Sequence, residues 1–340
     1  MRKTVFATLL LAAAMAAPMP ALAWDYVGHR IVGAVADAVL KQHHSAAYRR
    51  VNDLLDKKDA DGFVVLDRRL SQVAVYPDCA KDEEEFCGRK PTAEETAYVL
   101  RNLGHEGYHY TNSPLEEDAY KKNGVGATDT DLIQMINYTV LQLKRKNPFK
   151  FGVKLSNTEA LWLLAHLVGD VHQPLHVGQP YYDKTCQNRV NPNGLAVGDW
   201  VTTRGANSIK FESTFPAITP APSLHIYWDA ITIARAMHAK GYAGDEAGFA
   251  RMLAMAPPTN WKMDGEPETW VEKWYSEGIP LARLAAPPAN IAGKLNDRGE
   301  CEWTMKLDPA YETWAQDIAT QQLAKAGFRL AALLAAIFSN

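Results

Sequence analysis

Hydrophobic residues recur at helical spacing over much of the chain, and this pattern predicts a mainly α-helical protein. Five segments carry it: Val27–Leu40, Thr130–Lys144, Ser156 to about His172, about Leu224 to Lys240, and about Pro309 to Ile337. The third of these has the clearest ends. Ser156 and Glu159 form a capping box, and Pro174 follows the last apolar turn.

The pattern changes between Val177 and Pro222. This stretch is rich in Gly, Pro and Asn, and its only ordered signals are short β-like runs at Trp200–Thr203 and Ser208–Phe211. The sequence has no internal repeat and no linker that would divide it. We therefore predict one mainly α-helical domain with a long loop and a short β-hairpin excursion.

The N-terminus has a different character. Arg2 and Lys3 precede an apolar run from Thr4 to Ala17, and the small-residue triplet Ala21-Leu22-Ala23 follows. This order predicts a secretory signal peptide at residues 1–23 and a mature domain at residues 24–340 that starts at Trp24. No later stretch approaches the roughly 20 apolar residues of a membrane span. The sequence thus favours an exported protein, periplasmic or extracellular, with no membrane partner.

The charge balance limits what the protein can bind. The chain has 340 residues, with 36 Lys and Arg against 39 Asp and Glu, and removal of residues 1–23 takes away two basic residues, which leaves 34 minus 39, or −5. A mildly acidic protein lacks the basic face of a protein that coats duplex nucleic acid. If it handles phosphates, another source of positive charge is needed.

The four cysteines favour disulfides. They lie at Cys79, Cys87, Cys186 and Cys301, an even number without the paired spacing of a zinc ribbon. Four cysteines allow three connectivities. Of these we favour a short local loop, Cys79–Cys87, together with a long-range bridge, Cys186–Cys301.

Two His-x-x-x-Asp pairs lie on apolar helical segments: His166 with Asp170, and His225 with Asp229. Residues four apart share a helix face. An ionised Asp in such a setting costs several kcal/mol unless it is paired or bound to a metal. A buried hydrogen bond would explain one such pair equally well, but two pairs favour metal binding. Zinc accepts imidazole nitrogen and carboxylate oxygen, and two bridged ions suit phosphoryl chemistry.

The run from His166 to His176, His-Leu-Val-Gly-Asp-Val-His-Gln-Pro-Leu-His, resembles the central motif of the S1/P1 type zinc nucleases. The resemblance extends over essentially the whole mature chain. It includes the segments Trp24–His29, Val73–Asp78, Tyr108–Tyr110, Gly205–Asn207, Leu224–Asp229 and Gln322–Ala331. It implies the mainly helical fold shared by zinc phospholipases C and these nucleases.

The resemblance also implies three Zn²⁺ per chain. One ion would take Asp78, His109, His166 and Asp170. A second would share Asp170 and take His29 together with the α-amine and carbonyl oxygen of Trp24, and the third would take His176, His225 and Asp229. The α-amine has a pKa of ~8 and so deprotonates onto zinc more easily than a lysine does. Signal-peptide cleavage would therefore complete the site.

The same resemblance implies the activity. The expected protein is an endonuclease that hydrolyses single-stranded DNA and RNA to 5′-phosphate products, with 3′-nucleotidase activity. Asp78 and Asp170 would serve catalysis through the metal site, and Lys81 lies near a position that often carries a charge-stabilising Arg. Asn207, Tyr110 and Lys81 are the expected substrate-binding residues. Ala206 departs from the family's Gly-Gly-Asn segment, which leaves the conformation of the loop before Asn207 open.

Two other readings remain. A zinc phospholipase C shares the metal constellation, but its relatives carry Glu where this chain has Asp229. A non-catalytic zinc-binding protein would use closed four-ligand sites without a shared carboxylate, and nine candidate ligands with a bridging Asp argue against it. The sequence gives no oligomerisation signal, so a monomer is the default expectation.

Overall fold

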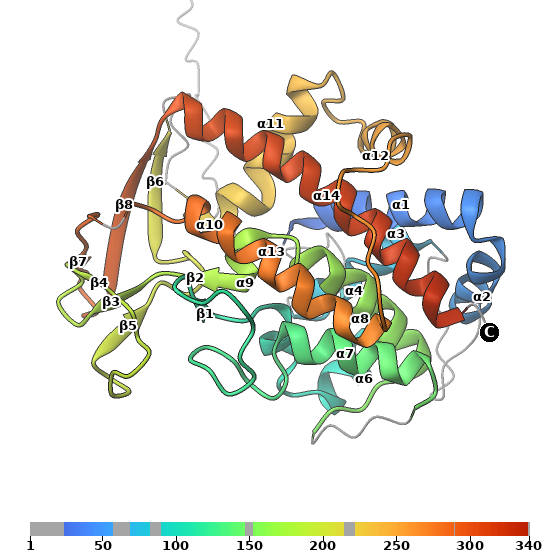
Figure 1. The fold of residues 1–340 in the computed structure, drawn as a ribbon, viewed down its shortest axis with the longest axis horizontal. Helices are drawn as coiled ribbons and strands as arrows, with labels where there is room; N and C mark the ends of the chain where they lie inside the picture. Colours follow the sequence, from blue (N-terminus) through green and yellow to red (C-terminus); the bar gives the residue numbers. More distant parts are fainter. Residues whose placement is uncertain are drawn as a thin grey trace, which may run out of the picture.

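Helices make up most of the molecule, and the short strands gather at one end of it (Figure 1). The computed structural model describes residues 24–56, 69–81, 90–146, 152–213, 222–288 and 290–338. The predicted signal peptide, residues 1–23, and Cys87 lie outside the described residues. The fold is mainly α-helical, as the sequence predicts. Within the described residues, no helix is both long enough and apolar enough to cross a membrane.

The strongest helix predictions are confirmed. The corresponding helices are α1 (Tyr26–His43), α7 (Leu132–Leu143), α8 (Asn157–Asp170) and α14 (Pro309–Phe338). The α8 helix begins with the expected capping box, in which Ser156 and Glu159 bond each other's backbone N–H. Pro174 ends this segment and also opens a new short helix, α9 (Pro174–Val177), because proline fits the first turn of a helix.

The predicted Leu224–Lys240 helix is present but divided. It consists of α10 (Leu224–Ile226), a π-helical turn η2 (Tyr227–Ile231) and α11 (Thr232–Ala239). Single π-turns inside helices occur often at functional sites, and this one contains Asp229.

Further helices were not identified from the sequence. They are α2 (Ser45–Leu55), α3 (Leu70–Val73), α4 (Tyr76–Lys81), α6 (Ala93–Arg101), η1 (His105–His109), α12 (Glu246–Ala254), η3 (Pro267–Thr269) and α13 (Trp270–Ala285). The α13 helix packs beside α9, although Pro280 lies within it.

The strands form three small sheets. In the first, β1 (Ser113–Pro114) pairs in parallel with β2 (Gly178–Gln179). In the second, β3 (Tyr181–Asp183) lies between β4 (Arg189–Val190) and β5 (Trp200–Thr202), antiparallel to both. In the third, β8 (Cys301–Leu307) pairs in parallel with β6 (Ile209–Ser213) and antiparallel with β7 (Lys294–Leu295).

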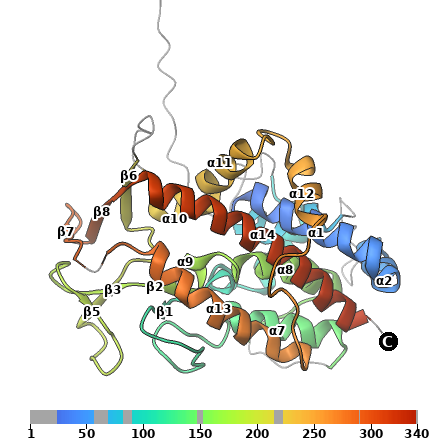
Figure 2. The same ribbon diagram turned by 45° about the horizontal axis from the view of Figure 1, so that its top comes forward.

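The two predicted β-like runs are therefore strands, but they do not form a hairpin with each other. The run at Trp200–Thr203 becomes β5 and joins a sheet within the excursion. The run at Ser208–Phe211 becomes β6 and pairs with β8, almost a hundred residues later in the chain. Local pattern cannot reveal a partner so distant in sequence. Figures 1 and 2 show β8 leading into α14.

Two hydrophobic cores meet at the functional site. The larger core lies among α1, α7, α8, α13 and α14, and α8 is buried along almost its entire length. The smaller core gathers around β6, β8 and α10, with Phe211, Trp228 and Trp303 among its buried side chains. Leu175 belongs to the smaller core and Val177 to the larger one. The short helix α9 therefore lies at the junction of the two.

The predicted long-range disulfide is present. Cys186 and Cys301 are bonded with a Cα–Cα distance of 5.6 Å, and they join the excursion to β8 across 115 residues of sequence. The predicted Cys79–Cys87 pairing involves Cys87, which lies outside the described residues.

We expect loss of the Cys186–Cys301 bridge to destabilise the protein without abolishing its fold. Closing so long a loop contributes about 2–4 kcal/mol, mainly by restricting the unfolded chain. The double variant Cys186→Ala, Cys301→Ala should therefore lower Tm by roughly 4–10 °C in a thermal unfolding scan. Wild-type protein treated with a reductant should unfold at the Tm of the variant or below it, because the reductant would also open the predicted Cys79–Cys87 bridge. An unchanged Tm in both samples would contradict this prediction.

Candidate metal centre

Five buried side chains from four segments form the first cluster: His29, Asp78, His109, His166 and Asp170. Asp170 lies at its centre. Its Oδ2 is 3.2 Å from His109 Nδ1 and 3.3 Å from His166 Nε2, and its Oδ1 is 3.4 Å from His29 Nε2. Asp78 Oδ1 is 3.6 Å from the same two nitrogens of His109 and His166. Asp170 thus presents its two oxygens to different imidazoles.

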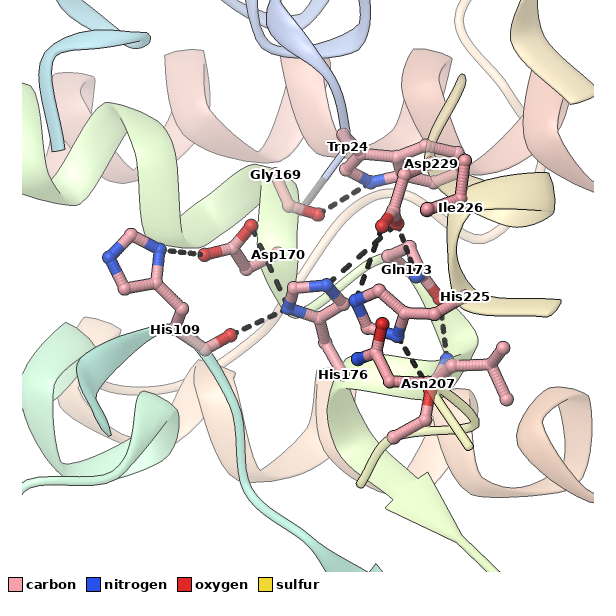
Figure 3. Close-up of polar contacts among 12 residues, drawn as sticks. Trp24, His109, Gly169, Asp170, Gln173, His176, Asn207, His225, Ile226 and Asp229 are labelled. Atoms are coloured by element: carbon pink, nitrogen blue, oxygen red, sulfur yellow. Dashed lines mark hydrogen bonds and ion pairs between the residues drawn. The ribbon is translucent and has the colours of Figure 1, made fainter. Parts of the chain in front are cut away.

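A second cluster lies beside the first and consists of His176, His225 and Asp229, also buried. Asp229 Oδ2 is 3.2 Å from His225 Nε2, and Oδ1 is 3.9 Å from His176 Nε2. The two imidazoles stack with ring centroids 4.9 Å apart. His176 Nδ1 is 3.9 Å from Asp170 Oδ1, so the two clusters adjoin (Figure 3).

Backbone carbonyls orient three of the imidazoles. The Nδ1 atoms of His166, His176 and His225 lie 2.6, 2.7 and 2.6 Å from the carbonyl oxygens of Ala74, His109 and Gly205. A carbonyl can only accept, so each Nδ1 donates, and in the neutral imidazole Nε2 then keeps its lone pair. Each lone pair then faces an Asp of its cluster. Metal-binding histidines are typically held by such a hydrogen bond on the other nitrogen.

Several buried polar atoms of these clusters have no hydrogen-bond partner within the described residues. They are both ring nitrogens of His29, Asp78 Oδ2, His109 Nε2, both oxygens of Asp170, His176 Nε2 and Asp229 Oδ2. Unsatisfied polar atoms are rare in protein interiors, and buried carboxylates need compensating charge. Imidazole and carboxylate are the donors that zinc accepts. The residues therefore fit metal ions held between them.

The three carboxylates differ in their electrostatics. Burial opposes ionisation of Asp170, but the surrounding imidazoles, His166 foremost, lower its pKa well below its usual range. Burial likewise opposes ionisation of Asp78, yet the Lys81 ammonium and the imidazoles lower its pKa. Burial raises the pKa of Asp229 well above its usual range, and the Asp170 carboxylate adds to the effect. Asp229 therefore needs a neighbouring cation to stay ionised.

The imidazoles are held in their neutral form. Burial lowers the pKa of His29 to about 4 and that of His225 to about 3. It also lowers the pKa of His109 and of His176. Only His166 has a raised pKa, because the Asp170 and Asp78 carboxylates outweigh its burial. Four of the five imidazoles are thus uncharged near neutral pH, as metal ligands must be.

Trp24 is anchored between the two clusters. Its indole Nε1 donates to the backbone oxygen of Gly169 at 2.8 Å, and the next residue, Asp25, donates its backbone N–H to the backbone oxygen of Asp229 at 3.0 Å. A Cβ on Gly169 would lie 2.9 Å from His29 Nδ1, so glycine is required where His29 packs against α8. Trp24 and Asp25 are therefore fixed beside both His–Asp pairs.

Gln173 was not singled out from the sequence, although it lies within the run His172–His176. It is fully buried, its Nε2 donates to Asp229 Oδ1 at 2.6 Å, and its Oε1 accepts from Leu175 N at 2.5 Å. The Leu175 contact fixes which way the amide faces. Gln173 thereby holds one oxygen of Asp229 and leaves Oδ2 turned toward His225 (Figure 3).

The predicted substrate-binding residues lie around these clusters. Lys81 Nζ is 2.8 Å from Asp78 Oδ1, and its side chain is 18% exposed. Tyr110 directly follows His109 and is 41% exposed. Asn207 Nδ2 donates to the Arg204 oxygen at 2.8 Å, and its Oδ1 is 3.4 Å from the hydroxyl of Ser223, which caps the helix that carries His225.

The chain is similar to known proteins over most of its length. The model of the S1/P1 nuclease family matches residues 24–339. The chain belongs to this family. Among its relatives, Endonuclease 4 of Arabidopsis thaliana is 28% identical over 94% of this chain and 91% of its own length. Endonuclease 2 of the same plant is 24% identical over 93% of this chain and 90% of its own length. The S1/P1 nucleases are metal-dependent hydrolases of nucleic acid, and the buried His and Asp clusters could hold the metal.

In this S1/P1 nuclease we expect Gln173 to control metal binding at the second cluster. Replacement by Leu, which has a similar size, leaves Asp229 Oδ1 without its donor. Changes to such supporting residues typically weaken metal affinity by about 10–100-fold. Metal content measured by mass spectrometry after dialysis against a weak chelator should fall by about one ion per chain in Gln173→Leu.

Gln142→Leu is the control, because Gln142 is a partly buried glutamine whose Nε2 donates to the Leu155 carbonyl oxygen and to Asn157 Oδ1, at the end of α8 away from Asp170. It should lose stability yet keep the wild-type metal content. Equal metal content in all three proteins at every chelator concentration would refute the role of Gln173.

Proposed function

We propose that the chain is an exported endonuclease with three zinc ions. It would hydrolyse phosphodiester bonds of single-stranded DNA and RNA to 5′-phosphate products, and act on small substrates as a 3′-nucleotidase. The observation that carries the proposal is Asp170, whose two oxygens face different imidazoles of a buried cluster. A carboxylate so placed suits a bridge between two ions, and paired ions suit in-line displacement at phosphorus.

Nine residues would hold the ions, in three sets. They are Asp78, His109, His166 and Asp170 for the first; Asp170, His29 and the backbone nitrogen and oxygen of Trp24 for the second; and His176, His225 and Asp229 for the third. Among the described residues, the ligand atoms of three groups lie close enough together to hold an ion: His109-His166-Asp170, His176-His225-Asp229 and His29-Asp78-His166. The first two support the first and third sets, and the last brings His29 of the second set next to ligands of the first. The position of Trp24 beside Gly169 and Asp229 supports the second.

When bound, the zinc ions would supply positive charge to the scissile phosphate and lower the pKa of a water molecule. The residues supply the frame for this chemistry. Asp78 and Asp170 keep depressed pKa values and so remain carboxylates. Lys81 adds a fixed positive charge near Asp78 at the edge of the site, where a phosphate would arrive. The ions and Lys81 would thus supply the positive charge that an acidic chain without a basic surface needs to bind phosphate.

The substrate would be a single strand because the clusters are buried. To reach buried ligands a phosphodiester has to bend into the site, which a flexible single strand does more easily than a stiff duplex. Tyr110, exposed beside His109, would offer a stacking surface for an unpaired base at about 1–3 kcal/mol. Asn207 would orient the phosphate from the His225 side of the site.

A zinc phospholipase C is the alternative enzyme, since it would share the metal ligands. The family match over residues 24–339 favours the nuclease. We also propose that residues 1–23 are a signal peptide, that the mature domain spans residues 24–340, that it is periplasmic or extracellular, and that it acts as a monomer without a membrane partner.

The activity is tested on correctly matured protein with its metal content measured on the same sample. We expect cleavage of single-stranded DNA, RNA and a 3′-mononucleotide, with 5′-phosphate ends, about three zinc ions per chain and no cleavage of a phosphatidylcholine analogue. A chelator should abolish cleavage and lower Tm by several degrees, because ligands from many segments lose their shared ions. Hydrolysis of the lipid analogue alone would show that the protein is a phospholipase C and would overturn the proposed nuclease activity.

The N-terminus is tested by adding a single methionine before Trp24. The added residue turns the α-amine into an amide, which cannot bind zinc in the same way. We expect this variant to hold about one zinc ion fewer per chain and to lose at least 90% of its activity. A variant with one extra residue at the C-terminus is the control and should match the wild type. Full zinc content and activity in the N-terminal variant would exclude the proposed role of Trp24.

A further inference from the structure

The loop before Asn207 has an unusual backbone. Arg204, Gly205 and Ala206 are three consecutive residues in the left-handed region, with φ values of 55°, 60° and 70°. This conformation costs roughly 1–2 kcal/mol for a residue with a side chain. It is held because Arg204 N–H donates to Thr202 Oγ1 at 2.9 Å and the Arg204 oxygen accepts from Asn207 N at 3.1 Å. The sequence leaves the conformation of this loop open, because Ala206 stands where the family has glycine. In the structure, Arg204, Gly205 and Ala206 are all left-handed.

One side of this loop faces the metal centre. The Gly205 oxygen accepts from His225 Nδ1, and its N–H donates to the buried Gln179 Oε1 at 2.7 Å. A Cβ on Gly205 would lie 3.3 Å from the His225 ring, so glycine suits this close approach. The loop therefore positions a candidate zinc ligand through one of its peptide units.

The other side of the loop opens into a cavity of about 400 Å³. The cavity lies against β5, β6 and the β7–β8 hairpin. Its charged and amide-bearing lining residues include Lys184, Arg204, Asn207, Lys210, Glu300 and Glu302. Asn207 belongs both to this cavity and, through Ser223, to the neighbourhood of His225. Asn207 thus links the cavity to the helix that carries His225.

Besides Lys184, the cavity is lined by two cations, Arg204 and Lys210, and by two carboxylates, Glu300 and Glu302. Lys184 pairs with Asp199 at 3.0 Å, and Glu300 and Glu302 both accept from Asn296 Nδ2, at 3.3 and 3.1 Å. The side chains of Arg204 and Lys210 make no ion pair within the part of the chain that the structure describes. An anion would therefore be drawn to the part of the cavity next to Asn207 and repelled from the part that holds the two glutamates.

The strain of the loop agrees with a role for the Arg204 side chain. Gly or Asn would adopt the left-handed conformation at lower cost, and strained residues concentrate at functional sites. A guanidinium binds phosphate with two parallel hydrogen bonds, and proteins that bind single strands follow the backbone with cationic grooves.

We propose that Arg204 and Lys210 form a subsite for a phosphate of the strand that flanks the scissile bond. A strand that passes over Asn207 would place one phosphate at the metal centre and a neighbouring one in the cavity. The inference rests on the proposed function, because it assigns part of the substrate-binding surface of the same site. It predicts that longer substrates bind better than a mononucleotide, and that these two residues are the reason.

The test measures kcat/KM for a 3′-mononucleotide and for thymidine oligonucleotides of two to eight residues. In the wild type, kcat/KM should rise with length and then level off. In the double variant Arg204→Gln, Lys210→Gln, the ratio of kcat/KM for the octamer to kcat/KM for the mononucleotide should fall about tenfold. The plot of log kcat/KM against log salt for the octamer should become shallower by about 0.7 for each phosphate that the variant no longer neutralises.

Two controls separate this effect from general loss of charge or of structure. The first control is the double variant Lys306→Gln, Arg251→Gln. It removes the same charge from exposed positions on β8 and α12 that do not line the cavity. Its ratio of kcat/KM for the octamer to kcat/KM for the mononucleotide should equal that of the wild type. Lys210→Gln alone, at an exposed position of β6, leaves the strained loop intact and should show part of the loss. If the variant Arg204→Gln, Lys210→Gln folds poorly, the Lys210→Gln variant alone still tests the subsite.

The outcomes are distinct. An unchanged ratio, or an equal loss on every substrate including the mononucleotide, would overturn the subsite while nuclease activity stands. Weaker inhibition of the mononucleotide reaction by inorganic phosphate, with unchanged length dependence, would mean that the cavity takes free phosphate and would also overturn it. A wild type that cleaves no nucleic acid would overturn the proposed function and the subsite together.

Discussion

The burial of three carboxylates is the constraint on which the rest of the structure depends. Asp78, Asp170 and Asp229 are almost inaccessible to water, and an uncompensated charge in such a place costs several kcal/mol or more. Asp170 lies at the end of α8, a helix that is otherwise apolar and buried. The positive charge and hydrogen bonds that compensate the Asp170 carboxylate must therefore come largely from other segments. This need explains why α1, α4, η1, α9 and η2 all converge on the end of one helix.

The segments that converge also orient one another. The His109 carbonyl oxygen accepts from His176, the Ala74 oxygen from His166 and the Gly205 oxygen from His225. Each of these carbonyls belongs to a segment that itself carries a candidate metal ligand or a candidate substrate-binding residue. A shift of one segment therefore turns an imidazole on another. Metal binding and folding are coupled in such a network, and the two clusters cannot be treated as independent sites.

The sequence predicted those parts of the structure that depend on local chemistry. The α8 helix was predicted because its capping box and its proline lie next to it, and the two His-x-x-x-Asp pairs because a helix places such residues on one face. His29, Asp78 and His109 have no such local signal and were indicated only by resemblance to a family. The α13 helix was not identified and contains Pro280, which usually interrupts a helix. The pairing of β6 with β8 depends on segments too distant for any local pattern.

The continuous segment formed by β8 and α14 fixes the loop before Asn207 relative to the candidate metal centre. β8 pairs with β6, which begins two residues after Asn207, and the chain then continues into α14. On α14, Gln322 donates to the His172 oxygen and Arg329 to His172 Nε2, where Nδ1 of the same ring donates to the Val168 oxygen. His172 lies in the turn between Asp170 and Gln173. Because β8 pairs with β6 and α14 contacts this turn, the end of the excursion is tied to the candidate ligands independently of the loops that precede Asn207. Those loops can therefore carry a strained backbone and a cavity without displacing the candidate ligands.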